Sequence, residues 1–164
     1  MTWARSLDLP VVAVLDTSAV VELKTLPPAV QMRLYGDLST LRARGCVTYP
    51  KKVTDELSLW AARDAPYSWA RSHRVSDPSF EDVRRVMAVV GDVVDTQKDH
   101  EDADPYVLAL AVALQREHGA NGVVVVSEDV RDRPTRISIA TACRRLGLRH
   151  LRLREFLAEF GLYP

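Results

Sequence analysis

The sequence lacks a surplus of charge of either sign, has only two cysteines, and contains no apolar run of membrane length. Lys and Arg together number 22, and so do Asp and Glu, so net charge alone indicates no class of partner. Cys46 and Cys143 are too few for a disulfide framework and lack metal-ligand spacing. We expect both to be buried apolar residues of a reduced, soluble, cytoplasmic protein with no membrane partner.

Apolar residues make up 47% of the 164 residues, which is enough for a single domain, 1–164, with a sizeable core. Charge is unevenly distributed along this chain. Residues 131–154 contain eight Arg and one acid, whereas residues 75–106 contain nine acids and three bases. The pattern is compatible with an acidic metal site beside a polyanion-binding surface, and also with two ordinary solvated faces.

Two short apolar runs without polar alternation, 11–15 and 123–126, predict strands that are buried on both faces of a parallel sheet. Weaker strands are predicted at 47–49 and 150–153. Helices are expected at 17–23, from Pro28 to a stop at Gly45, and at 51–63, 80–90, 105–118, 135–145 and 155–160, with 64–79 irregular. This order predicts a three-layer α/β/α fold, with a parallel central sheet of four to five strands and helices on both faces.

Four acids either follow a predicted strand or lie within or at the start of a predicted helix. Asp16 follows the first buried strand, and Asp129 follows the second. Asp104 precedes Pro105 at the start of a helix, and Glu56 falls on the apolar stripe of the 51–63 helix. Carboxyl ends of parallel strands share one sheet edge, so these side chains should converge there. Each acid also has a structural reading, as a helix cap, a loop start or, for Glu56, a rim acid paired with Lys52.

Converging carboxylates repel one another unless a cation compensates them. Mg²⁺ and Mn²⁺ prefer oxygen ligands of this kind, and no His or Cys accompanies the four acids, which argues against zinc. The pattern therefore predicts a Mg²⁺ or Mn²⁺ site, an arrangement typical of phosphodiester hydrolysis.

Four segments together give the chain a family resemblance. They are VVAVLDTS at 11–18, YPKKVTDEL at 49–57, ADPYVLALA at 103–111 and VVVSED at 124–129. In this order and spacing they resemble the PIN domain, the metal-dependent ribonuclease fold that includes VapC-type toxins, and in particular a subgroup with Asp-Pro before its central helix. The resemblance implies endonucleolytic hydrolysis of RNA, with Asp16, Glu56, Asp104 and Asp129 as metal ligands and catalytic residues.

The resemblance also implies supporting residues around these acids. Glu128 is a rival to Asp129 for the last ligand position, and Thr17, Ser18 and Ser127 would supply hydroxyls behind the acids. Asp102 is expected to be a solvated loop acid. Basic residues that flank the site in sequence are candidates for phosphate contacts, with surface solubility as the alternative: Lys51, Lys52, Arg131, Arg133 and Arg136.

Other functions remain open at the level of sequence. A non-catalytic PIN-like scaffold that binds RNA or a protein is the main alternative. A phospho-acceptor receiver domain would need adjacent acids after the first strand, and a haloacid-dehalogenase-type phosphatase would need Asp-x-Asp, where this chain has Ser18. A small antitoxin protein and a homodimer are compatible partners.

Overall fold

The computed structural model of this chain describes residues 7–60, 62–73 and 75–163. Its centre is a four-stranded, all-parallel sheet in the order β2-β1-β3-β4. The strands are β1 (Val12–Leu15), β2 (Val47–Thr48), β3 (Val123–Val126) and β4 (Arg149–Leu151). Both β1 and β3 are interior strands and every residue in them is buried, as their unbroken apolar runs predicted.

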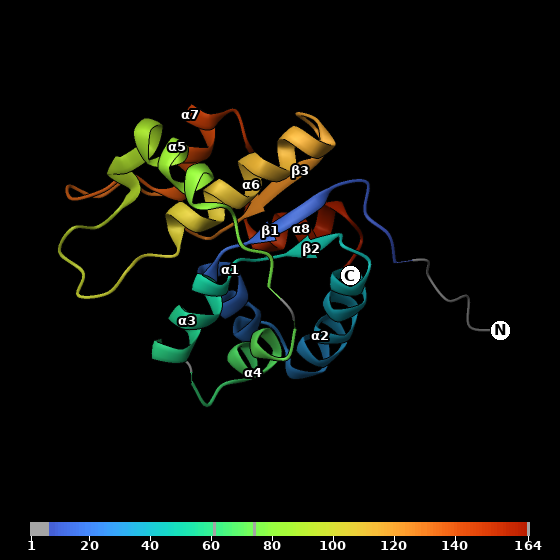
Figure 1. Cartoon of the computed structure of the whole chain (residues 1–164). Coiled ribbons are helices and arrows are strands. Elements are labelled where there is room, and N and C mark those ends of the chain that lie inside the picture. The colour runs from blue at the N-terminus through green and yellow to red at the C-terminus, as the bar shows by residue number, and fades with distance from the viewer. Residues whose placement is uncertain (1–6, 61, 74, 164) are drawn as a thin grey trace.

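Helices cover both faces of the sheet, which gives the predicted three-layer α/β/α architecture (Figure 1). The helices α5 (Phe80–Val90), α6 (Asp104–His118) and α7 (Ile139–Leu146) lie on one side. On the other side lie α1 (Thr17–Glu22), α2 (Pro28–Ala43), α3 (Lys51–Trp60) and α4 (Ala65–Arg71). The remaining elements are α8 (Leu153–Glu159) and the 3₁₀ turns η1 (Leu23–Thr25) and η2 (Gly91–Val93).

The helix α6 is central, and seven of its residues are buried from Asp104 to Ala111. It contacts both β1 and β3, and it packs against α5 and α7. An apolar surface nearly all round the helix is what such a position requires. Because α6 begins at the carboxyl edge of the sheet, it delivers its first residue, Asp104, to that edge.

The prediction that residues 64–79 are irregular is wrong, because α4 occupies 65–71. Pro66 lies in the first turn of this helix, where proline is tolerated, and Asp64 takes the N-cap position. Trp69 and Ala70 are buried and tie the helix to the core. Pro66 is therefore part of a helix start.

Three details of the predicted helices also differ. The helix predicted from 135 begins at Ile139, and its N-cap Ser138 accepts a 3.1 Å hydrogen bond from the backbone of Thr141. On α5 the buried residues are Val86 and Val90, whereas Phe80 at its start is 84% exposed. Ala103 holds the N-cap position of α6, so Asp104 is not the cap and its side chain is available for other contacts.

Cys46 and Cys143 are both buried and free, as expected. Within the described residues, none of the helices is both long enough and apolar enough to cross a bilayer.

Candidate metal centre

Parallel pairing of β1 with β3 brings the two strand-end acids to one edge of the sheet. Leu15 is paired with Val126, and the Asp16 amide continues the ladder with a 3.0 Å hydrogen bond to the Val126 carbonyl. Asp16 and Asp129 therefore leave neighbouring strands on the same side. The loops 94–103 and 127–138 also project together from this side of the molecule (Figure 1).

The carboxylate of Asp16 is buried and held by two hydroxyls. Ser18 Oγ donates to Asp16 Oδ2 at 2.6 Å, and Ser127 Oγ donates to the same oxygen at 2.8 Å. Burial raises the pKa of Asp16, whereas these two hydrogen bonds lower it, and the charge of Asp129 raises it further. Both hydroxyls belong to residues that were predicted to lie behind the acids.

Arg136 joins Asp104 to Asp129. Its Nη1 donates to Asp129 Oδ2 at 2.8 Å and lies 3.3 Å from Asp104 Oδ2. The backbone amide of Ile139, at the start of α7, also donates to Asp129 Oδ2, at 3.0 Å. Arg136 was predicted to contact phosphate, but its side chain is only 8% exposed and serves as a counter-ion inside the acidic cluster.

Glu56 is buried on α3, and its Oε1 accepts a 2.7 Å hydrogen bond from the Ala103 amide. The alternative in which Glu56 pairs with Lys52 is wrong, because Lys52 pairs with Glu101. Burial and the charge of Asp16 both raise the pKa of Glu56.

The pKa of Asp104 is raised well above its usual range. Burial is the main cause, and the charges of Asp16 and Asp102 add to it, while Arg136 opposes them. Among the described residues, Arg136 is the one cation in ion-pair contact with any of the four predicted acids. The cluster thus carries more negative charge than its surroundings compensate, and its donor set of carboxylate oxygens suits a hard divalent cation.

The four predicted acids share this edge without forming a closed ligand shell. In the described part of the chain, the single set of three ligand atoms that all lie within 4.8 Å of one another belongs to Glu56, His100 and Asp102. A metal ion bound by the predicted acids would therefore have to draw them together, in competition with Arg136. The four carboxylates suit a divalent metal ion in chemistry and in charge. Arg136 contacts two of them, Asp104 and Asp129, and would compete with the metal ion for their oxygens.

His100 and Asp102 are site residues that sequence reasoning missed. Asp102 was expected to be solvated, but it is 3% exposed, and Lys98 and the Asp95 amide satisfy its two oxygens at 2.5 and 3.1 Å. His100 contradicts the expectation that no histidine accompanies the acids. The His-x-Asp-x-Asp run at 100–104 was the available signal, since alternate residues before a helix start can share a face.

Glu128 and Thr17, two other predicted supporting residues, differ in their surroundings. The Glu128 carboxylate accepts from Arg152 Nε at 2.9 Å and from the Leu153 amide at 2.8 Å, so it is engaged at the start of α8. This favours Asp129 over Glu128 as the last acid of the cluster. The buried Thr17 hydroxyl lies next to Glu56 and lowers the pKa of that carboxyl.

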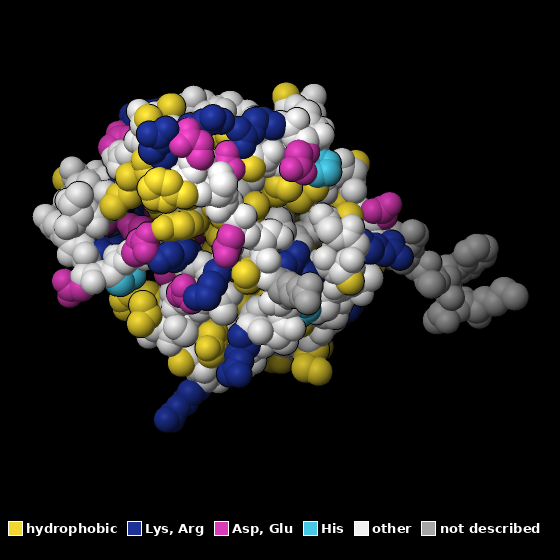
Figure 2. Space-filling view, in the orientation of Figure 1, with side chains coloured by type: hydrophobic (Ala, Val, Ile, Leu, Met, Phe, Trp, Pro, Cys, Tyr) yellow, Lys and Arg dark blue, Asp and Glu magenta, His cyan; other side chains and the backbone are white. Residues whose placement is uncertain are grey.

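The candidate phosphate contacts divide into paired and unpaired cations. Lys51 pairs with Asp55 at 2.9 Å, and Lys52 pairs with Glu101. The exposed side chains of Arg131 and Arg133 make no hydrogen bond or ion pair with any described residue, and both line a cavity of about 480 Å³ that Asp129 also lines. On the face shown in Figure 2, basic and acidic side chains are interspersed rather than gathered into patches of one sign.

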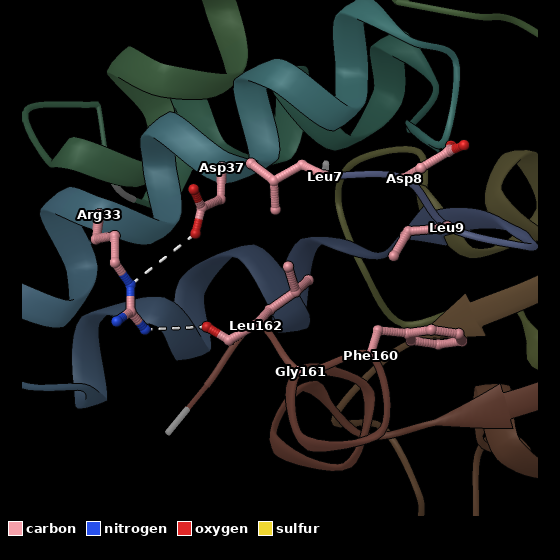
Figure 3. Close-up of a pocket in the computed structure, with 8 residues that line it drawn as sticks. All are labelled: Leu7, Asp8, Leu9, Arg33, Asp37, Phe160, Gly161 and Leu162. Atoms are coloured by element: carbon pink, nitrogen blue, oxygen red, sulfur yellow. Dashed lines mark hydrogen bonds and ion pairs between the residues drawn. The ribbon is translucent and has the colours of Figure 1, made fainter. Parts of the chain in front are cut away.

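A cavity of about 570 Å³ lies at the opposite end of the sheet. It is formed by the segment that precedes β1, by α2 and by the turn after α8 (Figure 3). Within it, Arg33 faces Asp37 at 3.9 Å and donates to the Leu162 carbonyl at 3.0 Å. None of the predicted site residues lines this cavity, so its size does not identify the functional site.

Comparison of the chain with curated proteins finds no significant match. A family model described as "Domain of unknown function (DUF4411)" matches residues 14–162, which include every acid of the cluster. The chain therefore belongs to the DUF4411 family.

Proposed function

We propose that this protein is a Mg²⁺- or Mn²⁺-dependent endoribonuclease with a PIN-like fold and active site. The observation that carries the proposal is a set of carboxylates at the carboxyl edge of the sheet, of which Asp16, Glu56 and Asp104 are buried and Asp129 is partly buried. A protein with no use for a cation would have little reason to bury so many acids against one arginine.

In this proposal the four acids would hold the ion. When bound, the ion would supply Lewis-acid stabilisation of the negative charge that develops on the phosphate during hydrolysis. The hydroxyls of Ser18 and Ser127 fix the Asp16 carboxylate in one orientation. Arg136 fixes Asp129 in the same way and reduces the repulsion between Asp129 and Asp104.

The proposed substrate follows from the cations that have no acidic partner. Arg131 and Arg133 line a cavity beside Asp129, where they would bind the phosphates that flank the scissile bond. Lys51 and Lys52 are already paired with acids and are weaker candidates. A role as the toxin of a toxin–antitoxin pair, with a small protein blocking this edge, and a cytoplasmic location are extensions of the same proposal.

The test is cleavage of single-stranded RNA with Mg²⁺ or Mn²⁺ by the wild type, Asp16→Asn and Asp104→Asn. We expect cleavage by the wild type that stops in EDTA, and a loss of at least about 100-fold in each variant. Circular dichroism should show the same fold in all three proteins. Equal cleavage by all three, or RNA binding without cleavage, would instead support the non-catalytic scaffold.

A further inference from the structure

We propose that Glu56, His100 and Asp102 form a second metal position, for a transition-metal ion such as Mn²⁺, Co²⁺ or Zn²⁺. It lies beside the acids of the proposed nuclease site and shares only Glu56 with them. The inference concerns metal binding and does not depend on cleavage of RNA.

The first argument is geometric. The three side chains each offer one ligand atom, and these atoms lie within 4.8 Å of one another. Two ligands of one ion are separated by at most about 4.2 Å, since zinc–nitrogen and zinc–oxygen bonds are close to 2.1 Å. Movements of a few tenths of an ångström would therefore close this set on an ion.

The second argument is an unsatisfied imidazole. His100 Nε2 is buried and has no hydrogen-bond partner among the described residues, a state that costs free energy unless something binds there. The Trp60 ring packs edge-on against the imidazole, with ring centroids 5.8 Å apart, and this contact restrains the orientation of the imidazole. An imidazole nitrogen held in a fixed orientation beside two carboxylates can bind a metal ion with little rearrangement.

Both carboxylates are also oriented by backbone amides. Glu56 accepts from Ala103, and Asp102 accepts from Asp95, so in each case one oxygen is fixed by the backbone. Hydrogen bonds of this kind hold metal ligands in position. The mixed nitrogen and oxygen donor set suits transition metals better than Mg²⁺, which binds imidazole poorly.

Lys98 currently supplies the positive charge at this position. Its Nζ lies 2.5 Å from Asp102 Oδ1, and its side chain is 33% exposed, so it can turn toward solvent when an ion arrives. Lys98 is therefore a competitor of the metal. Removal of the ammonium group should therefore strengthen metal binding, whereas removal of a ligand should weaken it.

The experiment is a titration of the intact protein with Co²⁺, followed by quenching of Trp60 fluorescence. We expect saturable quenching that excess Mg²⁺ does not reverse and that Trp60→Phe removes. His100→Ala should weaken the binding at least 10-fold, and Lys98→Met should tighten it. Asp129→Asn, which alters only the nuclease site, should leave the quenching unchanged.

Three outcomes would overturn the proposal. Unchanged quenching in His100→Ala would show that the imidazole is not a ligand. Loss of quenching in Asp129→Asn would assign the ion to the nuclease acids instead. Weaker binding in Lys98→Met would show that the ammonium group supports the site. Failure of RNA cleavage alone would leave this inference intact, because the titration measures no activity.

Discussion

Arg136 donates a 2.8 Å hydrogen bond to Asp129 from a side chain that is only 8% exposed. Removing the guanidinium would leave the buried Asp104 and the partly buried Asp129 without a counter-charge. We expect Arg136→Met to lower the free energy of unfolding in EDTA by about 3 kcal/mol. A saturating divalent cation should restore more stability to this variant than to the wild type, because it replaces the lost charge.

Denaturant titration with and without Mg²⁺ measures this effect. The matched control is Arg145→Met, which breaks an exposed ion pair with Asp92 and should cost less than about 1 kcal/mol. Equal losses in the two variants would mean that Arg136 does not compensate the acidic cluster.

The buried acids also predict how stability depends on pH in the absence of metal. The pKa of Asp104 is raised well above its ordinary value of 3.8, so between the two values the folded protein binds more protons than the unfolded chain. The stability contribution of Asp104 is therefore greatest below about pH 4 and is lost as the pH rises through the folded-state pKa.

Asp104→Asn removes the contribution of Asp104 to the pH dependence of stability. Comparison of this variant with the wild type separates that contribution from those of the other carboxylates. In EDTA, we expect the variant to gain stability relative to the wild type as the pH is raised from about 4.5 to about 7.5. Chemical denaturation across this range checks the prediction. A constant difference between the two proteins would contradict a raised pKa at Asp104.

The exposed guanidinium groups of Arg131 and Arg133 predict the salt dependence of RNA binding. In an Asp16→Asn background, which prevents cleavage, Arg131→Ala with Arg133→Ala should reduce the slope of log Kd against log salt by about 1.4. Fluorescence anisotropy with single-stranded RNA measures it. Arg149→Ala, at an arginine paired with Glu159 away from the acidic edge, should leave the slope unchanged.

The contacts of Glu128 predict which acid completes the metal site. Its carboxylate binds Arg152 and Leu153, whereas Asp129 lies in the cluster. We expect Glu128→Gln to retain most of the metal-dependent cleavage and Asp129→Asn to lose it. The reverse result in a cleavage assay would assign the ligand to Glu128 and require the start of α8 to rearrange.

Two glycines predict opposite effects on stability. A Cβ at Gly122 would lie 2.3 Å from the His118 carbonyl oxygen, so Gly122→Ala should destabilise the fold by about 1–3 kcal/mol. A Cβ at Gly36, inside α2, would meet nothing within 4 Å, so Gly36→Ala should stabilise it by about 0.5–1 kcal/mol. Thermal unfolding of both variants checks the pair.

The sequence by itself determined the sheet and most of the helices. Unbroken apolar runs such as Val123–Val126 predicted interior strands, because only a strand covered on both faces tolerates them. Gly45, with its positive φ, marked the end of α2 as predicted. The acids at the ends of β1 and β3 were predicted to be neighbours because parallel strands end at one edge.

Only the tertiary structure decided how these charges are partnered. Nothing local in the sequence shows that Arg136 folds back onto Asp129, that Lys52 takes Glu101, or that His100 reaches Glu56. Those pairings join separate loops and helices, and they depend on how α3, α6 and the loops around them pack. The sequence therefore supplied the acids, and the packing of the chain determined which of them have a counter-ion.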